Sequence, residues 1–162
     1  MNATIIYHSE TGNTQKMAEL IASSMETIEG VNVKTFSIEN IDIEYVKTSK
    51  CLILGTPIYA AGATAKIHDY IQNYLGDCDV AGKLGGAFAT ANYVHGGGEL
   101  GIRSILDAMM VKGMIVYSGG AAYGKPVIHL GPVGLGNDTE YTQAFFIEYG
   151  KRMATMAVKL FG

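Results

Sequence analysis

The sequence contains little cysteine and no concentrated positive charge. Two cysteines, Cys51 and Cys78, are too few for a disulfide framework, and Cys51 lies in an apolar run typical of an inert buried thiol. The twelve Lys and Arg residues are scattered among fifteen acids, and the net charge of −3 excludes a basic nucleic-acid-binding surface. Because His8, His68 and His129 have no metal-ligand spacing with cysteines or acids, no metal site is predicted.

Long apolar runs are absent as well. No stretch approaches the roughly 18 apolar residues that a membrane span needs. The first residues also have no basic region that leads into such a stretch. We therefore expect a cytoplasmic protein with no membrane partner.

The chain is rich in apolar residues, which make up 48% of its 162 residues, whereas charged residues make up 17%. This composition excludes a disordered chain and indicates surface that is buried on a cofactor or a neighbouring subunit. The length predicts a single domain, residues 1–162, with a substantial core. Together with methionine pairs at 109–110 and at 153 and 156, the apolar composition favours a homo-oligomer, although helices buried in the core of a single chain would look the same.

Apolar runs of strand length alternate with stretches of helical period. Strands are predicted at residues 3–8, 31–37, 50–56, 84–90 and 113–118. Helices are predicted at residues 13–28, 42–48, 64–75, 99–112 and 139–161. Since parallel neighbours need crossover connections, the alternation predicts an α/β fold: a doubly wound five-stranded parallel sheet with helices on both faces.

In such a sheet, ligands bind outside the carboxyl ends of the strands. The segments to inspect are therefore 9–14, 57–63, 91–98 and 119–138, and all four are rich in small residues. The last is too long for a simple connection and is predicted to be irregular and functional. Its glycines indicate a close approach to another group.

The segment after the first predicted strand has the character of a phosphate site. Ser9, Thr11 and Thr14 supply hydroxyls, Asn13 supplies an amide, and Gly12 permits a turn that directs backbone N–H groups inward. The segment opens a helix, whose free N–H groups and dipole favour an anion. An ordinary helix cap needs only one or two of these side chains. We therefore expect a terminal phosphate here.

Other phosphate-binding motifs do not fit. The Gly-Lys-Ser/Thr end of a P-loop is absent, and His8 and Ser9 stand where a receiver domain needs clustered acids. The run Gly96–Gly101 matches the glycine spacing of a dinucleotide fingerprint, but it is separated from the preceding strand and has no acid about 20 residues later. We interpret it as a close-approach loop.

Two loop tyrosines suggest a flat ligand. Tyr59 is followed by small residues, and Tyr93 lies in the next loop along the sheet. Either side chain alone is equally consistent with a loop aromatic, but together they can wall an aromatic ring system. A phosphorylated flat cofactor with the shape of FMN accounts for both this feature and the phosphate loop.

The segment Ser9-Glu10-Thr11-Gly12-Asn13-Thr14 resembles the Thr/Ser-x-Thr-Gly-x-Thr phosphate loop of flavodoxins, and the resemblance covers the whole chain. It implies a flavodoxin-like strand order of 2-1-3-4-5 and noncovalent FMN with its phosphate on residues 9–14. It also implies that two loops flank the isoalloxazine. These loops comprise Pro57, Ile58, Tyr59, Ala60, Ala61 and Gly62, and Thr90, Ala91, Asn92, Tyr93, Val94, His95 and Gly96.

Within this superfamily, the second half of the chain resembles the flavodoxin-like NAD(P)H:quinone oxidoreductases of the Trp-repressor-binding-protein group. The resemblance is carried by Gly55-Thr56-Pro57, His95-Gly96-Gly97-Gly98-Glu99, Gly119–Gly124 and Tyr149–Leu160. It implies a multimer, a dimer or a tetramer, in which glycine-rich loops line a shared flavin pocket.

The leading functional hypothesis is an FMN-dependent NAD(P)H oxidoreductase that passes electrons to a quinone or another small acceptor. Hydride transfer to a flavin needs no catalytic triad, and the protein supplies orientation and electrostatics. Backbone amides of residues 91–97 are candidates to stabilise the reduced flavin. The predicted catalytic residues are His95 and Tyr123, with Lys125 beside Tyr123 as a further contact for the nicotinamide; an alternative for His95 is a packing role at the pocket edge.

The alternative is a flavodoxin-type electron carrier that docks on protein redox partners. Such carriers present a strongly acidic face, which a net charge of −3 does not favour. A flavin-binding sensor or scaffold is a third interpretation.

Overall fold

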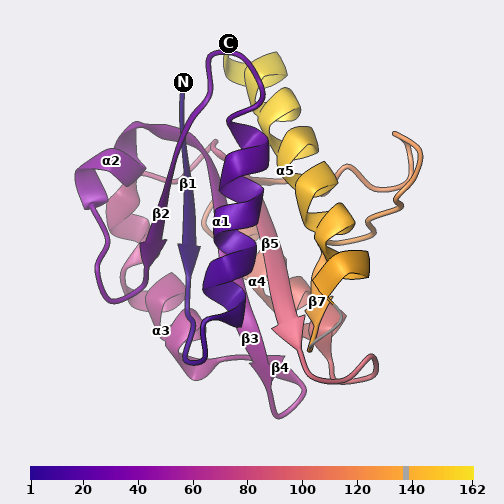
Figure 1. Cartoon of the computed structure of the whole chain (residues 1–162). Helices are drawn as coiled ribbons and strands as arrows, with labels where there is room; N and C mark the ends of the chain where they lie inside the picture. Colours follow the sequence, from indigo (N-terminus) through magenta and orange to yellow (C-terminus); the bar gives the residue numbers. More distant parts are fainter. Residues whose placement is uncertain (137–138) are drawn as a thin grey trace.

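The computed structural model describes residues 1–136 and 139–162 of the chain (Figure 1). The strands are β1 (Asn2–Tyr7), β2 (Asn32–Ser37), β3 (Ser49–Tyr59), β4 (Gly62–Ala63), β5 (Leu84–Ala91), β6 (Ile115–Val116) and β7 (Val133–Leu135). The helices are α1 (Asn13–Met25), α2 (Ile43–Thr48), α3 (Ala65–Asn73), the 3₁₀ turn η1 (Leu75–Cys78), α4 (Gly98–Val111) and α5 (Thr139–Phe161).

The sheet confirms the predicted fold class and strand order. Its main strands lie in the order β2-β1-β3-β5-β6, and each is parallel to its neighbours. Numbered along the chain without β4, this is the order 2-1-3-4-5. The carboxyl ends of β1, β3 and β5 therefore meet at one edge of the sheet, the lower edge in Figure 1.

The prediction for the last strand was wrong in detail. Of the predicted strand 113–118, only Ile115–Val116 forms β6, because the edge of β5 is divided between two partners. Leu84 and Gly85 pair with β6, whereas Ala89–Ala91 pair in parallel with β7. The predicted irregular segment 119–138 thus contains a strand, and its residues 137 and 138 lie outside the described part of the chain.

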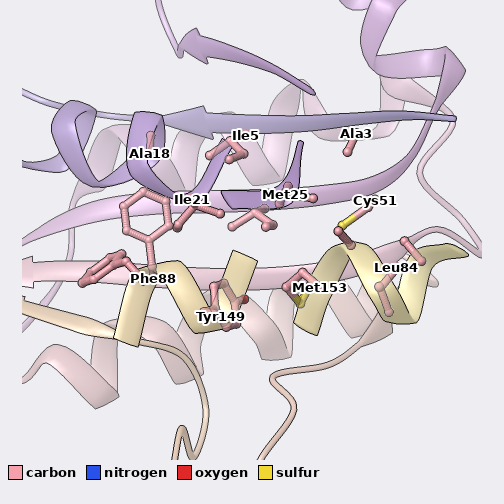
Figure 2. Close-up of a cluster of buried hydrophobic side chains, with 14 of the residues drawn as sticks. Ala3, Ile5, Ala18, Ile21, Met25, Cys51, Leu84, Phe88, Tyr149 and Met153 are labelled. Carbon is pink, nitrogen blue, oxygen red and sulfur yellow. The ribbon is translucent and has the colours of Figure 1, made fainter. Parts of the chain in front are cut away.

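Helices cover both faces of the sheet, and each face has its own hydrophobic core. One core lies under α1 and α5 and includes Ile5, Ile21, Phe88 and Tyr149 (Figure 2). The other lies under α2, α3 and α4, with residues such as Leu54, Ile67 and Ile105. Burial of each large apolar side chain contributes about 1.5–3 kcal/mol to stability. The two cores fix the sheet from which the loops project.

Glycines allow α5 to pack closely on its neighbours. A Cβ at Gly86 in β5 would overlap the Tyr149 hydroxyl, and a Cβ at Gly150 would overlap Ser24 Oγ of α1. Since backbone and side chain meet without room for a methyl group, α5 lies directly against both β5 and α1 (Figure 1). The long helix is therefore anchored in the core rather than laid over it.

None of the helices in residues 1–136 and 139–162 combines the length and the apolar character needed to cross a membrane.

Candidate flavin site

Loops from the carboxyl ends of the strands enclose a cleft with a volume of about 310 Å³. This volume lies at the lower end of the range typical of small-ligand sites. The cleft is lined by residues of four segments that lie far apart in the sequence: Glu10, Thr11, Asn13, Thr14, Lys16, Met17, Pro57, Ile58, Tyr59, Thr90, Ala91, Asn92, Gly134, Leu135, Gly136 and Thr142. Ten of these sixteen belong to the predicted cofactor residues.

The segment 9–14 has the structure expected of an anion site. Gly12 adopts a left-handed backbone with φ of 91°, and its amide and that of Gln15 donate to Ser9 Oγ at 3.2 and 3.3 Å. Within the described residues, the backbone amides of Asn13 and Thr14 have no hydrogen-bond partner. These groups lie at the amino terminus of α1, where the helix dipole favours negative charge. The turn therefore offers free donors to a ligand.

A buried hydrogen bond connects this segment to β5. Thr14 Oγ1 lies 2.8 Å from Thr90 Oγ1, and both side chains are buried. Thr90 stands near the carboxyl end of β5, so the bond fixes the start of α1 over the centre of the sheet. Because both threonines line the cleft, the bond holds two of its walls together.

A β-hairpin with a two-residue turn forms a second wall of the cleft. The chain turns between β3 and antiparallel β4 through Ala60 and Ala61, which have φ of 49° and 61°. Left-handed backbone is unfavourable for residues with a Cβ, so this turn is strained. Tyr59, at the end of β3, is 47% exposed, and its hydroxyl donates to Glu10 Oε2 at 3.3 Å. Burial and then the nearby Glu10 carboxylate raise the pKa of Tyr59.

The glycines within residues 96–101 allow the segments around the cleft to pack closely on one another. Gly97 has φ of 94° and lies against the backbone of Ala61, and Gly101 lies against Ile58. A Cβ at Gly98 would overlap the side chain of Val133 in β7. The glycines are thus used for protein packing at the start of α4, which agrees with the close-approach interpretation and explains the spacing without a dinucleotide.

The loop between β5 and α4 extends into solvent. Tyr93 and Val94 are 68% and 85% exposed, and the rings of Tyr93 and His95 lie 6.2 Å apart. Tyr93, Val94, His95 and Gly96 do not line the cleft of the described structure. Their contact with a cofactor stays a prediction, as does that of Ser9, Gly12, Ala60, Ala61 and Gly62.

Tyr123 and Lys125 lie in a segment that is organised by a buried arginine. Arg152 of α5, 6% exposed, pairs with Glu148 at 3.0 Å and donates to the carbonyl oxygens of Gly120, Tyr123 and Gly124 at 3.3, 3.4 and 3.3 Å. Burial, followed by a hydrogen bond with Tyr123, raises the pKa of Tyr117 to about 12. Neither Tyr123 nor Lys125 lines the cleft, so the catalytic role of Tyr123 also stays a prediction.

Sequence reasoning missed six lining residues. Lys16 and Met17 lie one turn into α1, directly after the predicted loop, and helical spacing places them over it. Gly134, Leu135 and Gly136 come from β7, and Thr142 from α5. The run Val-Gly-Leu-Gly at 133–136 combined strand-forming residues with glycines, which was the available signal for β7.

No group of three or more His, Cys, Asp or Glu side chains in the described residues is placed to hold a metal ion. The cleft therefore presents hydroxyls, amides and apolar surfaces rather than metal ligands.

Comparisons with known proteins agree with this geometry. The family model described as Flavodoxin matches residues 5–94, which include the first two cleft-forming loops. A flavodoxin of Clostridium saccharobutylicum is 36% identical over 161 residues, covering 99% of this chain and all of the relative. The structure of a flavodoxin from the domain Archaea superposes with a TM-score of 0.80 at 23% identity, covering 98% of this chain and 99% of that one.

A more distant relative is an NAD(P)H dehydrogenase (quinone) of Acidithiobacillus ferrooxidans, 24% identical with 98% of each chain covered. That alignment extends over 197 positions, more than the 162 residues of this chain. The relative therefore has insertions that this chain lacks. Both groups named by the sequence resemblance are found among the relatives, and the resemblance is confirmed.

Proposed function

The chain belongs to the flavodoxin family, and from this premise we propose that it binds FMN noncovalently in the cleft and acts as an electron carrier between redox proteins. Bound FMN would supply the redox chemistry, and the protein would supply orientation, electrostatics and access. The observation that carries the proposal is the pairing of an anion site with an adjoining cleft that has small and flat walls.

The residues present fit a flavin phosphate. Unpaired amides of Asn13 and Thr14, with the hydroxyls of Ser9, Thr11 and Thr14, can hold the terminal phosphate through hydrogen bonds. Among the described lining residues, Lys16 is the one cation and Glu10 the one acid. Phosphate binding would thus rest on neutral donors with support from a single positive charge.

The opposite end of the cleft suits the ring system. Pro57, Ile58 and Tyr59 supply one wall, and Ala91 and Asn92 begin the other. Aromatic side chains pack on flat rings with about 0.5–1.5 kcal/mol beyond their area burial. The exposed side chains of Tyr59, Tyr93 and Val94 stand on the two loops that border this end. They give a protein partner an apolar surface close to the cofactor.

Three observations favour the carrier over the enzyme. The 36% identical relative named flavodoxin has nearly the same length, whereas the quinone dehydrogenase is longer. Tyr123 lies outside the cleft lining, in a segment whose carbonyl groups are bound by Arg152. His95 is exposed on the loop after β5. Neither of the two predicted catalytic side chains, Tyr123 and His95, is therefore among the described residues that line the cleft.

An FMN-dependent NAD(P)H oxidoreductase is the second candidate, because a second cavity adjoins the first. This cavity has a volume of about 300 Å³ and shares Leu135 and Thr142 with the cleft. Its other walls include Tyr141 and Phe145, whose rings pack edge to face with their centroids 5.4 Å apart. A small acceptor or a nicotinamide ring would fit such an apolar site beside the flavin.

Anaerobic reduction distinguishes the two candidates. The FMN-loaded protein is mixed with excess NADH or NADPH and then with dithionite, while the visible flavin band is followed. The carrier predicts a band that both nicotinamides leave unchanged and that dithionite bleaches. Rapid bleaching by either nicotinamide, restored by added benzoquinone, would establish the oxidoreductase instead.

The oligomeric state remains a prediction from composition and resemblance. Sedimentation equilibrium of the purified protein tests it directly. A dimer or a tetramer is expected.

A further inference from the structure

His8 follows the last residue of β1 and is almost completely buried, with 3% of its surface exposed. Its Nδ1 atom lies 3.0 Å from Thr64 Oγ1. Its other ring nitrogen, Nε2, is buried and has no hydrogen-bond partner in the described residues. Because buried polar atoms rarely lack a partner, this nitrogen calls for an explanation beyond core packing.

The neighbours of His8, with the Glu10 carboxylate on the side of Nε2, favour one of its two neutral tautomers. Thr64 Oγ1 accepts from Ile67 N at 3.4 Å as the cap of α3, and its hydroxyl proton can be donated to His8 Nδ1. A neutral imidazole that accepts at Nδ1 carries its proton on Nε2. Burial and then Lys66 lower the pKa of His8, against the opposing effects of Glu10 and Glu39, so the neutral form is favoured near neutral pH. Nε2 is thus a hydrogen-bond donor.

Of the charged side chains around His8, Glu10 is the one that the described structure places in an ion-pair contact with it, since its Oε1 atom lies 3.7 Å from Nε2. This distance is longer than a hydrogen bond, and a small inward movement of the Glu10 side chain closes it. The other oxygen of Glu10 accepts from the Tyr59 hydroxyl at 3.3 Å. Glu10 therefore lies between His8 beneath the phosphate loop and Tyr59 on the hairpin.

We infer that His8 is a positioning residue whose Nε2–H holds Glu10 against Tyr59 and thereby sets the spacing of the phosphate loop and the β3–β4 hairpin across the cleft. The inference rests on the proposed function, in that the bound molecule is FMN. Glu10 and Tyr59 line the cleft and His8 does not, so His8 acts through Glu10. Thr64 keeps the imidazole in place, since its own amide donates to Thr56 Oγ1 at 3.1 Å.

A matched pair of substitutions separates the two nitrogens of His8. His8→Gln places an amide near the position of Nε2 and keeps the donor to Glu10. His8→Asn reaches only the position of Nδ1, so it keeps a partner for Thr64 and loses the donor. FMN affinity is measured by quenching of flavin fluorescence, with urea unfolding as a check on each fold. We expect His8→Asn to weaken FMN binding about fivefold and His8→Gln to bind close to the wild type.

A double-mutant cycle tests whether His8 acts through Glu10 on Tyr59. Tyr59→Phe is expected to weaken FMN binding. The double variant, His8→Asn with Tyr59→Phe, should bind FMN no more weakly than whichever single variant binds it less tightly, because both substitutions break the same His8–Glu10–Tyr59 connection. Additive losses, or wild-type affinity in His8→Asn, would overturn the inference. If His8→Asn fails to fold, Glu10→Ala replaces it in the cycle with the same expectation.

A measurement without FMN distinguishes failure of the inference from failure of the proposed function. Nitrogen-15 NMR of the cofactor-free protein should show His8 with its proton on Nε2, and Glu10→Gln should shift that signal. A proton on Nδ1, or a signal unaffected by Glu10→Gln, contradicts the inference even where FMN binds. If the wild type binds no FMN while the NMR result is as expected, the proposed function fails and the His8–Glu10 contact stands.

Discussion

Two glycine-containing turns of this protein use their backbone groups in opposite ways. Around Gly12, the amides of Asn13 and Thr14 have no partner in the described structure. In the segment Gly119–Gly124, three carbonyl oxygens accept hydrogen bonds from the buried Arg152. The first turn is open to a ligand, and the second is occupied by the protein's own cation. Glycine content therefore identifies a close approach, whereas the free or bound state of the backbone groups identifies a site.

The largest expected effect comes from removing the internal cation of the second turn. Arg152→Ala leaves the partly exposed Glu148 carboxylate and three carbonyl oxygens without their partner, and loss of the partner of hydrogen-bonded groups costs about 1–3 kcal/mol. Urea unfolding should show this loss, with FMN affinity of the folded fraction unchanged. Arg152→Lys, which keeps the charge but has fewer donors, should lose less. A fall in FMN affinity in either folded variant would show that the segment Gly119–Gly124 belongs to the cofactor site. The two turns would then not differ in function.

A substitution that adds backbone strain but no steric clash tests whether the first turn binds FMN. Gly12→Ala puts a Cβ into open space but forces alanine into left-handed backbone, at a cost of about 1–2 kcal/mol. We expect FMN affinity to fall about tenfold, which corresponds to 1.4 kcal/mol. Gly30→Ala is the matched control, since Gly30 has φ of 78° and equally open space away from the cleft. It should lose similar stability and keep its FMN affinity, and equal affinities in the two variants would contradict the prediction.

The hairpin extends the comparison to a turn that lacks glycine at its left-handed positions. Ala60→Gly removes the steric penalty at φ of 49° and should raise the free energy of unfolding by about 1 kcal/mol. Ala108→Gly, in the interior of α4, should lower it by about 0.5–1 kcal/mol. Chemical denaturation of both variants measures the two signs. A less stable Ala60→Gly would show that the turn is not strained.

The smallest expected effect concerns the charge beside the first turn. Lys16→Gln removes the cation that lines the cleft, and an exposed ion pair contributes less than about 1 kcal/mol. FMN affinity should therefore fall by less than about fivefold, and the difference from the wild type should shrink in high salt. Lys151→Gln, an exposed lysine of α5 outside the cleft, should bind FMN as the wild type does. A large loss for Lys16→Gln would mean that charge rather than the free amides dominates phosphate binding.

Local signals were enough to predict that residues 9–14 form a loop at the ligand-binding end of the sheet, and to place the main strands along the chain. The sequence 9–14 combines hydroxyls, an amide and a glycine within one turn between a strand and a helix, and the structure places it at the cleft. The long buried run of β3 and the alternation of strands and helices likewise needed no tertiary information. The resemblance to flavodoxins then supplied the strand order.

The remaining features depend on contacts that are distant in the sequence. β4 has two residues, and its turn is Ala60-Ala61 rather than the Asn-Gly typical of such hairpins, so no local signal marked it. β7 has three residues and exists because part of the edge of β5 is free to pair. Arg152 has the sequence context of an exposed helix residue, and only the packing of α5 shows that it binds another segment.

The shared edge of β5 has a consequence for changes in chain length. β6 and β7 each close their own part of the edge, with Ile115 N donating to Lys83 O and Gly136 N donating to Ala91 O, both at 2.9 Å. The chain between them leaves the sheet and rejoins the same strand. Lengthening this connecting segment destabilises the fold only slightly, because the entropic cost of closing a loop grows with the logarithm of its length. A reporter peptide inserted near Val127 would therefore stand beside the second cavity, which Val127 lines, while the central sheet keeps its pairing.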